Sequence, residues 1–179
     1  MPAMLCLVPT PIGNLGDISP RARDALAEAD FIAAEDTRVT RKLLNYLDFK
    51  KPLVSYYEHN KLESGPKIVA RILEGQTCAL VSDAGSPAIS DPGEDLVRLC
   101  TEAGIPVCAI PGPCAAITAL SISGLPTGRF CFEGFLSTNK KNRQAHLTAL
   151  RGETRTMIFY EAPHKLQNTL KDLTDAFGP

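Results

Sequence analysis

Short apolar runs alternate with amphipathic segments along the first two thirds of the chain. The runs contain β-branched residues and are bounded by turn residues, so they predict buried strands at 4–8, 30–34, 53–57, 77–81 and 106–110. The segments between them predict helices at 20–29, 38–47, 67–74, 91–104 and 115–124. This alternation predicts an α/β fold with a mostly parallel sheet and helices on both faces.

Helix signals support this division. Ser19 precedes Pro20 as a predicted N-cap, and Asp91 is predicted to cap a helix with Pro92 in its first position and Glu94 three residues after the cap. Gly75 is a stop signal for the helix before it.

The pattern changes after residues 125–128 (LPTG). Beyond them the sequence predicts strands at 130–135 and 156–160, a basic helix at 139–150 and a helix at 163–176. We therefore expect two α/β domains, 1–124 and 125–179. Two strands with two helices are marginal as an independent layer. The second domain is thus expected to be truncated, with an apolar sheet edge exposed unless a second copy covers it.

Parallel strands place the loops that follow them at one edge of the sheet, where open α/β sheets bind ligands. In the central loop, residues 82–87 (SDAGSP) combine little bulk with one carboxylate, Asp83. That suits a ligand with a sugar hydroxyl or an ammonium group, although Asp83 as a simple helix cap stays open. The loops at 9–17 and 111–116 either approach a ligand with their backbone or are turns that pack tightly.

Charged and titratable residues follow the same strands. Glu35, Asp36 and His59 are candidate bases at the expected edge, although Asp36 or Thr37 also fits a helix cap and a lone His is commonly polar surface. Lysines and arginines form two groups that flank the expected cleft. Each group alone is commonly a solvated face, whereas the two together favour a partner with a phosphate backbone. The groups are Arg38, Arg41 and Lys42, and Lys140, Lys141 and Arg143.

Composition limits which partners, metal sites and cellular locations we expect. The formal net charge of −1 provides no global attraction for nucleic acid, so any such site must be a local patch. The six cysteines form no C-x-x-C pair, which predicts free thiols in a reducing cytoplasm and no metal site. We find no apolar run long enough to span a bilayer and no signal-type segment, so we expect a cytoplasmic protein without a membrane partner.

Six stretches occur in a familiar order: LVPTPIGNLGDIS, AEDTRVTRKLL, EHN, LVSDAGSPAISDPG, IPGPCAAITALSISGLP and IFYEAPHKL. Together they closely resemble the bacterial small-subunit ribosomal RNA 2′-O-methyltransferases, which modify a cytidine ribose. These belong to the tetrapyrrole-methylase superfamily of S-adenosylmethionine (SAM) enzymes. The resemblance covers nearly the whole chain. It implies two α/β domains with SAM between them, a homodimer, and small-subunit ribosomal RNA, within the 30S subunit, as substrate.

The resemblance also implies the residues of the cofactor site. The family's SAM-contacting pattern matches Ile12, Asp83, Ser86, Cys114, Ala115, Tyr160 and Glu161. Tetrapyrrole methylases carry a G-x-G-x-G-type stretch in the first loop, whereas this chain has PTPIG at 9–13, which favours the ribosomal RNA branch. Two alternatives stay open: a small-molecule, tetrapyrrole-type SAM methyltransferase and a non-catalytic SAM-binding module.

The chemistry of such a reaction is compatible with the predicted edge. A ribose hydroxyl must lose a proton as it attacks the methyl group, so a nearby base would help. Glu35, Asp36 and His59 remain equal candidates at this point.

Overall fold

The computed structural model describes residues 3–178, and its contacts divide the chain into two units, Met1–Ala115 and Ala116–Pro179. Helix α5 (Ala115–Ile122) therefore groups almost entirely with the second unit, whereas the predicted boundary at 124/125 left it with the first. One reason is a hydrogen bond within the second unit: the Ala116 amide donates to the Tyr160 hydroxyl oxygen at 3.0 Å.

The first unit contains a parallel sheet, called here the first sheet, in the strand order β3-β2-β4-β1-β5. Its strands are β1 (Leu5–Leu7), β2 (Phe31–Ala34), β3 (Leu53–Ser55), β4 (Cys78–Val81) and β5 (Val107–Ala109). Its helices are α1 (Pro20–Glu28), α2 (Thr37–Tyr46), α3 (Lys61–Leu73) and α4 (Glu94–Glu102), with a 3₁₀ turn, η1 (Leu15–Asp17). The predicted parallel α/β sheet is confirmed.

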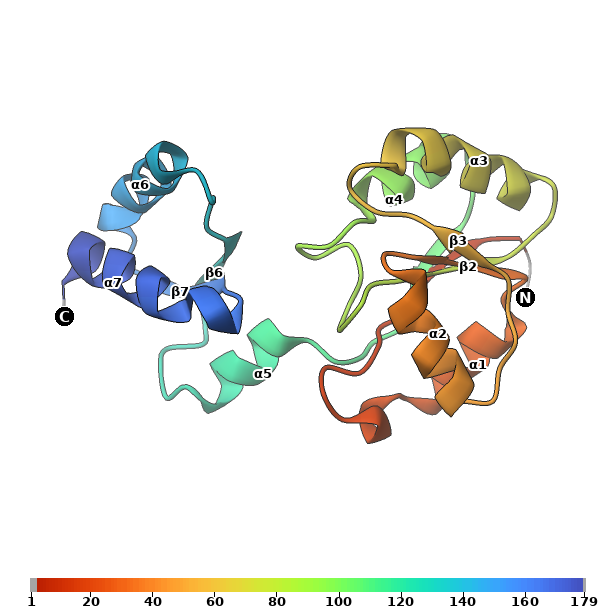
Figure 1. Cartoon of the computed structure of the whole chain (residues 1–179), viewed down its shortest axis with the longest axis horizontal. Coiled ribbons are helices and arrows are strands. Elements are labelled where there is room, and N and C mark those ends of the chain that lie inside the picture. The colour runs from red at the N-terminus through yellow and green to blue at the C-terminus, as the bar shows by residue number, and fades with distance from the viewer. Residues whose placement is uncertain (1–2, 179) are drawn as a thin grey trace. The chain divides into compact units, whose positions relative to one another are not determined.

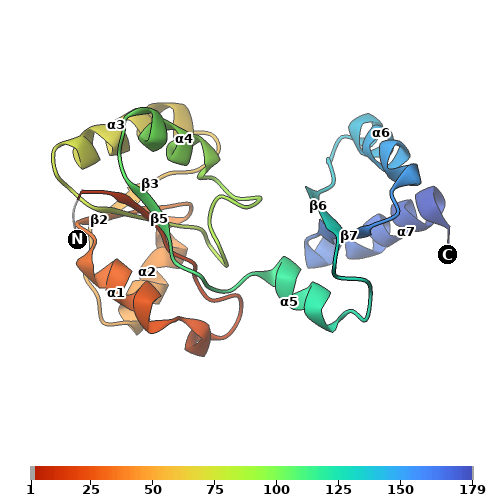
Figure 2. The same ribbon diagram turned by 180° about the vertical axis from the view of Figure 1, so that it is seen from behind.

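The direction of the crossovers reverses in the middle of this sheet. The chain leaves β1 towards β2 and β3 on one side, and it leaves β4 towards β5 on the other. Because such crossovers are right-handed, α1 and α2 cover one face and α3 and α4 cover the other, as Figures 1 and 2 show. The carboxyl ends of the neighbours β1 and β4 thus form the topological switch point, where open α/β sheets bind ligands.

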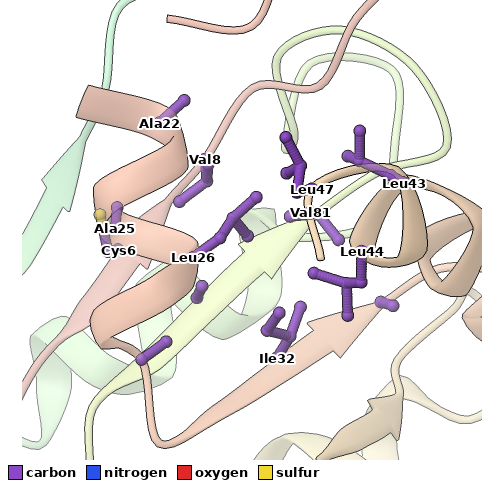
Figure 3. Packing of buried hydrophobic residues seen from close by; sticks show 13 residues of the cluster. Cys6, Val8, Ala22, Ala25, Leu26, Ile32, Leu43, Leu44, Leu47 and Val81 are labelled. Carbon is purple, nitrogen blue, oxygen red and sulfur yellow. The ribbon is translucent and has the colours of Figure 1, made fainter. Parts of the chain in front are cut away.

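Alternation along β4 supplies both faces of the core. Ala79 and Val81 pack with Leu26 of α1 and Leu44 of α2 in one buried cluster, which Figure 3 shows from close by. Cys78 and Leu80 belong to the cluster beneath α3 and α4. Burying one large aliphatic side chain of this kind stabilises the fold by about 1.5–3 kcal/mol, so the first sheet has two substantial apolar layers.

Two predicted helix caps are confirmed. The Ala22 amide donates to the Ser19 hydroxyl at 3.1 Å at the start of α1, and the Arg38 amide donates to the Asp36 carboxylate at 2.8 Å at the start of α2. These contacts satisfy amides that the first helical turn leaves without partners.

The predicted start of α4 is wrong. The helix begins at Glu94, with Gly93 rather than Asp91 at the N-cap position. Gly93 has φ 150°, and a Cβ there would lie 2.9 Å from the Leu80 side chain. The chain therefore makes a sharp, closely packed turn after Asp91 that the cap signal did not anticipate.

Helix α3 begins at Lys61 rather than at the predicted residue 67, with Pro66 inside the helix. A tertiary contact favours this earlier start, because the Lys61 ammonium pairs with Glu58 at 2.9 Å and with Asp95 of α4 at 2.7 Å. Gly65 also permits a close approach, since a Cβ there would lie 3.0 Å from Leu99. A long-range contact thus outweighs the local breaker signal of the proline.

The second unit is built around two parallel strands, called here the second sheet, with the bounds predicted for them. After α5 the elements are β6 (Phe130–Phe135), α6 (Lys140–Ala149), η2 (Leu150–Gly152), β7 (Thr156–Tyr160), η3 (Pro163–Lys165) and α7 (Leu166–Phe177). A bulge between Phe132 and Gly134 breaks strict alternation in β6. Both Phe132 and Phe135 therefore contact the Tyr160 ring edge-on, at 4.9 and 5.5 Å between centroids.

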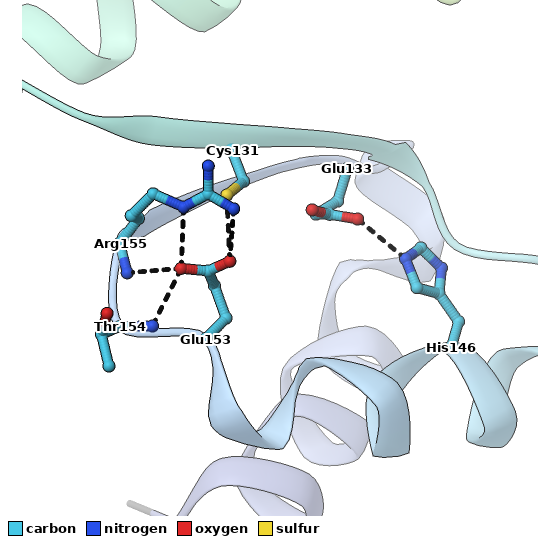
Figure 4. A network of polar contacts seen from close by, with 6 residues as sticks. All are labelled: Cys131, Glu133, His146, Glu153, Thr154 and Arg155. Atoms are coloured by element: carbon cyan, nitrogen blue, oxygen red, sulfur yellow. Dashed lines mark hydrogen bonds and ion pairs between the residues drawn. The ribbon is translucent and has the colours of Figure 1, made fainter.

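Polar side chains link strand β6 of the second sheet to helix α6 and to the loop before β7 (Figure 4). The Glu153 carboxylate accepts hydrogen bonds from the Arg155 guanidinium at 2.6 and 2.9 Å and from the Cys131 thiol of β6 at 3.3 Å. Glu133 of β6 contacts His146 of α6 at 2.9 Å.

Within residues 3–178, the structure contains no helix long and apolar enough to cross a membrane.

Candidate functional site

Two loops are joined at the switch point. Thr10, after β1, and Gly85, after β4, exchange both backbone hydrogen bonds, at 2.9 and 3.0 Å. The Thr10 hydroxyl also donates to the Ser82 carbonyl at 3.2 Å. The carboxyl ends of β1 and β4 are therefore linked by one small rigid assembly.

A third loop, after β5, packs against this assembly. The Ser86 hydroxyl donates to the Pro113 carbonyl at 3.1 Å. A Cβ at Gly85, where φ is 88°, would lie 3.4 Å from Ile12, and a Cβ at Gly112 would lie only 2.3 Å from Pro9. Two glycines thus permit the close approach of the three loops.

Three predicted cofactor residues, Ile12, Asp83 and Ser86, are thereby brought together. Cys114 and Ala115 follow directly from the packed loop, at the start of α5. The sequence motifs did not single out Thr10, which makes three of the hydrogen bonds that join the loops. A hydroxyl residue between two prolines just after a strand was the one available signal.

Backbone strain is concentrated in the β4–α4 loop. Ala88 and Ser90 have φ values of 66° and 62°, in the left-handed region that residues with a Cβ seldom adopt. Each such residue costs about 1–3 kcal/mol, and strain of this kind clusters at ligand clamps and active sites. The surrounding loops hold this segment in a shape that its own residues do not favour.

Two pockets flank the joined loops. One, of about 390 Å³, is mostly apolar and opens on the α4 side between Ser86, Ile89, Val97 and Ile110. The other, of about 210 Å³, opens on the α2 side and is lined in part by Leu43 and Asp83. Apolar pockets with a few polar groups at the rim are typical of small-molecule sites.

A third pocket, of about 570 Å³, is acidic and includes two of the predicted bases, Glu35 and His59. Burial raises the pKa of Glu35, and the nearby charges of Asp91 and Asp83 raise it further. Burial likewise raises the pKa of Asp83 and of Asp91. The loops that carry Glu35 and Asp83 are in contact, because the Asp83 amide donates a hydrogen bond to the Glu35 carboxylate at 3.5 Å.

The three predicted bases differ in their surroundings. Asp36 caps α2 and forms an ion pair with Arg38 at 2.6 Å, and these contacts lower its pKa to about 2. His59 lies in a turn that the Asn60 side chain fixes by accepting from the Tyr57 amide and donating to the Ser55 carbonyl. Because its raised pKa makes its carboxylate the more basic, Glu35 is better suited than Asp36 to take a proton.

The cations predicted to bind RNA differ in whether they form ion pairs. Arg38 forms an ion pair with Asp36, whereas Arg41 and Lys42 are exposed on the same helix. Lys140 and Lys141 are exposed at the start of α6.

Arg143, in contrast, has a side chain only 14% exposed and forms an ion pair with Asp172 at 2.5 Å. Its guanidinium also donates to the Thr169 hydroxyl at 3.2 Å, so this side chain has partners within the second unit, and its role towards a nucleic acid stays a prediction.

Tyr160 and Glu161 lie at the end of β7 in the second unit. The Tyr160 hydroxyl accepts from Ala116, and the Glu161 carboxylate accepts from the Ala162 amide at 2.8 Å and the Thr169 hydroxyl at 2.6 Å. The Thr169 hydrogen bond is the main reason that the pKa of Glu161 is lowered. Their role towards SAM stays a prediction.

The edge of the first sheet fits the chemistry of a nucleoside-type cofactor. The 390 Å³ pocket offers apolar walls for a flat base, and Asp83 offers a carboxylate for a hydroxyl or ammonium donor. A metal ion needs several ligands in one place, and in the part of the chain that the structure describes no three His, Cys, Asp or Glu side chains are placed to hold one.

The fold and the joined loops define an open α/β protein with a topological switch point, the place where proteins of this class bind ligands. Comparison with known families shows which family of α/β proteins this is. The sequence matches the family described as Tetrapyrrole (Corrin/Porphyrin) Methylases over residues 4–179, and the chain belongs to that family.

Among curated proteins, the chain is similar to two proteins named ribosomal RNA small subunit methyltransferase I. The one from Escherichia coli O157:H7 is 52% identical over 174 residues, covering 97% of this chain and 61% of the relative. The one from Synechocystis sp. is 54% identical over 175 residues, covering 98% and 63%. The chain thus spans about three fifths of the length of these relatives.

Solved structures agree on the fold. The methyltransferase CobJ has a TM-score of 0.68 at 21% identity, covering 97% of this chain and 76% of that one. Uroporphyrin-III-C-methyltransferase from Thermus thermophilus has a TM-score of 0.66 at 22% identity, covering 99% and 76%. At such identities the likeness concerns architecture alone.

Proposed function

We propose that the chain belongs to a SAM-dependent methyltransferase that modifies the 2′-hydroxyl of a cytidine ribose in small-subunit ribosomal RNA. The observation that carries this proposal is the identity of 52% and 54%, over nearly the whole chain, to relatives named ribosomal RNA small subunit methyltransferase I. The sequence resemblance supplies the finer statement about the ribose of a cytidine.

Bound SAM supplies a methyl group that its own sulfonium activates, so the protein mainly has to position the reactants and exclude water. In our proposal the 390 Å³ pocket holds the adenine, and Asp83 accepts a hydrogen bond from a ribose hydroxyl or the ammonium group. Ser86, which lines this pocket, holds the β4 loop against Pro113 through its hydroxyl hydrogen bond.

Glu35 is our candidate for the group that takes the proton of the attacking hydroxyl. Burial and two neighbouring carboxylates raise its pKa, whereas Arg38 makes Asp36 a much weaker base. His59 shares the same pocket as Glu35 and is the alternative.

The partner is proposed to be the 30S subunit, approached by exposed cations rather than by net charge. Arg41 and Lys42 lie on α2, and Lys42 lines the 210 Å³ pocket that also contains Asp83. Phosphates contacted by these side chains would bring a target nucleotide beside the cofactor edge. We further propose a cytoplasmic homodimer, which rests on the resemblance alone.

The test is methyl transfer from labelled SAM to 30S subunits that lack the modification, followed by mapping of the modified nucleotide. We expect label on a cytidine ribose, and Glu35→Gln should lower kcat while leaving SAM affinity unchanged. His59→Gln is the matched variant and should retain activity. The assay compares the 179-residue chain with one extended to the length of its relatives.

Two other results would contradict the proposal. Label on a tetrapyrrole precursor, and none on RNA, would favour a small-molecule methylase. SAM binding without transfer to any ribosomal substrate, in both the short and the extended chain, would favour a non-catalytic module.

A further inference from the structure

The pocket of about 210 Å³ on the α2 side of the joined loops lies between three segments of the first unit. The loop after β1 and η1 contribute Pro11 and Leu15, α2 contributes Val39 and Leu43, and the start of the β4 loop contributes Asp83. Leu43 also belongs to the buried cluster of Figure 3, so this wall is continuous with the core. Pockets for drug-sized ligands measure about 300–1,000 Å³, so this smaller one fits a single-ring group better than a whole cofactor.

One polar group on the wall of this pocket has no partner in the protein. Thr40 of α2 lines the pocket and is only 3% exposed, and its hydroxyl oxygen makes no hydrogen bond with any residue in 3–178. A threonine inside a helix can satisfy its hydroxyl on the carbonyl one turn earlier, as Thr101 of α4 does on Val97 at 2.9 Å. An unpaired buried hydroxyl costs free energy, and a ligand that completes its hydrogen bonds would explain it.

The rim of the pocket carries charge of both signs. Lys42 lines it and, like its neighbour Arg41, is exposed on α2, where such a side chain can contact a phosphate. The Asp83 carboxylate is held in place by the Asp36 amide, which donates to its Oδ1 at 3.1 Å. The pocket thus combines apolar walls, one unpaired hydroxyl and a cation at its rim. A flat ring with a polar edge, linked to a phosphate, complements each of these features.

We propose that this pocket takes the pyrimidine base of the target nucleotide, with the Thr40 hydroxyl bonded to the polar edge of the base and Lys42 to a phosphate. Sequence-specific RNA recognition commonly holds unstacked bases by such edges, and a hydroxyl can donate to a ring carbonyl or nitrogen. The inference rests on the proposed function, which supplies RNA as the substrate. Asp83, the carboxylate proposed to hold SAM, lines the same pocket, so a base bound there brings its ribose beside the cofactor edge.

The first experiment uses Thr40→Val, which keeps the shape of the side chain and removes the hydroxyl, in the chain extended to the length of its relatives. The kcat/KM for 30S subunits that lack the modification should fall about two- to tenfold, as for one lost hydrogen bond, and SAM affinity by calorimetry should not change. The melting temperature should rise by about 2–4 °C, because the variant no longer buries an unpaired hydroxyl. A purely structural role would not lower activity while raising stability.

Two variants control this comparison. Thr40→Ser retains the hydroxyl and should methylate as the wild type does. Thr101→Val makes the same change at an exposed position of α4 and should leave kcat/KM unaltered.

The second experiment tests the size of the pocket and the phosphate contact separately. Val39→Phe fills the pocket and should lower kcat/KM for the same subunits at unchanged SAM affinity. Subunits assembled with a purine at the mapped target position should be methylated about tenfold less efficiently by the wild type, and Val39→Ala, which widens the pocket, should reduce that difference. Lys42→Gln should lower the slope of log affinity against log salt by about 0.7–0.9, whereas Thr40→Val should leave the slope unchanged.

The outcomes separate this inference from the proposed function. Unchanged kcat/KM in both Thr40→Val and Val39→Phe, with active wild type, would overturn the inference and leave the methyltransferase function intact. Weakened SAM binding in these variants would overturn it too, because it would assign the pocket to the cofactor. If the wild type methylates no RNA, the proposed function fails and the inference fails with it. Should Val39→Phe not fold, Thr40→Val still provides the comparison, because it is expected to be the more stable protein.

Discussion

The two sheets of this chain are stabilised in different ways. In the first sheet every residue of β2 and β4 is buried, because helices cover both faces. In the second sheet every residue of β7 is only half-buried, and Phe135 of β6 is 54% exposed. Two strands bury little by themselves. The comparison indicates that apolar packing specifies the first unit, whereas oriented polar contacts specify much of the second.

The carboxylates show the same contrast. At the edge of the first sheet, burial raises the pKa of Glu35, Asp83 and Asp91. In the second unit, hydrogen bonds lower the pKa of Glu153 and Glu161. Burial disfavours the charged form in the first group, a cost that a cationic or hydroxyl-bearing ligand would offset, and the second group stabilises its unit while ionised.

A core substitution should separate the units most strongly. Leu80→Ala removes a fully buried side chain beneath α4 and should lower the free energy of unfolding by about 2–5 kcal/mol. Phe135→Ala, in the second sheet, should cost less than about 1.5 kcal/mol, because that ring is half exposed and its main interaction is with Tyr160. Urea unfolding followed by circular dichroism measures both, and equal decreases would contradict the comparison.

Removal of the edge carboxylate should affect binding rather than packing. Asp83→Ala should weaken SAM by about 1–3 kcal/mol if the carboxylate accepts a hydrogen bond from it. Calorimetry provides the value, with Asp24→Ala on the exposed side of α1 as the control. A dissociation constant unchanged by Asp83→Ala would exclude this residue from the site.

Removing the charge of Glu35 and that of Glu161 should change the free energy of unfolding with opposite signs. The raised pKa of Glu35 means that its contribution to stability is present below its ordinary value of 4.5 and is lost as the pH rises from there through the raised folded-state pKa, so Glu35→Gln should stabilise the protein at pH 7 by less than about 1 kcal/mol. The lowered pKa of Glu161 means that stability is present above 4.5 and lost as the pH falls, so Glu161→Gln should destabilise at pH 7. Melting temperatures between pH 3 and 7 test both, and shifts of the same sign would refute the contrast.

The smallest effect is expected at the exposed cations of the first unit. Neutralising Arg41 and Lys42 together should weaken RNA binding and leave SAM binding unchanged. The slope of log affinity against log salt should shrink by about 0.7–0.9 for each phosphate that the variant no longer neutralises. Lys50→Gln, at an exposed position outside α2, is the control. An unaltered slope in the double variant would mean that this face of α2 is only solvated surface.

Local signals predicted much of the fold. The bounds of β6 and β7, and the caps Ser19 and Asp36, agree with the structure because each depends on residues close together in the sequence. The starts of α3 and α4 were predicted wrongly for the opposite reason. The pairing of Lys61 with Asp95 and the packing of Gly93 against Leu80 depend on distant parts of the chain.

The candidate site divides in the same way. By itself the sequence determined the strand–helix alternation and the loops that carry Ile12, Asp83 and Ser86, since hydrophobic period and turn residues are local properties. Only the tertiary structure decided the strand order, and with it the switch point, and the bridge from Thr10 to Gly85. It alone decided that Glu35 has a raised pKa and that Arg143 is directed inward to Thr169, because burial and long-range contacts exist only once distant segments have packed together.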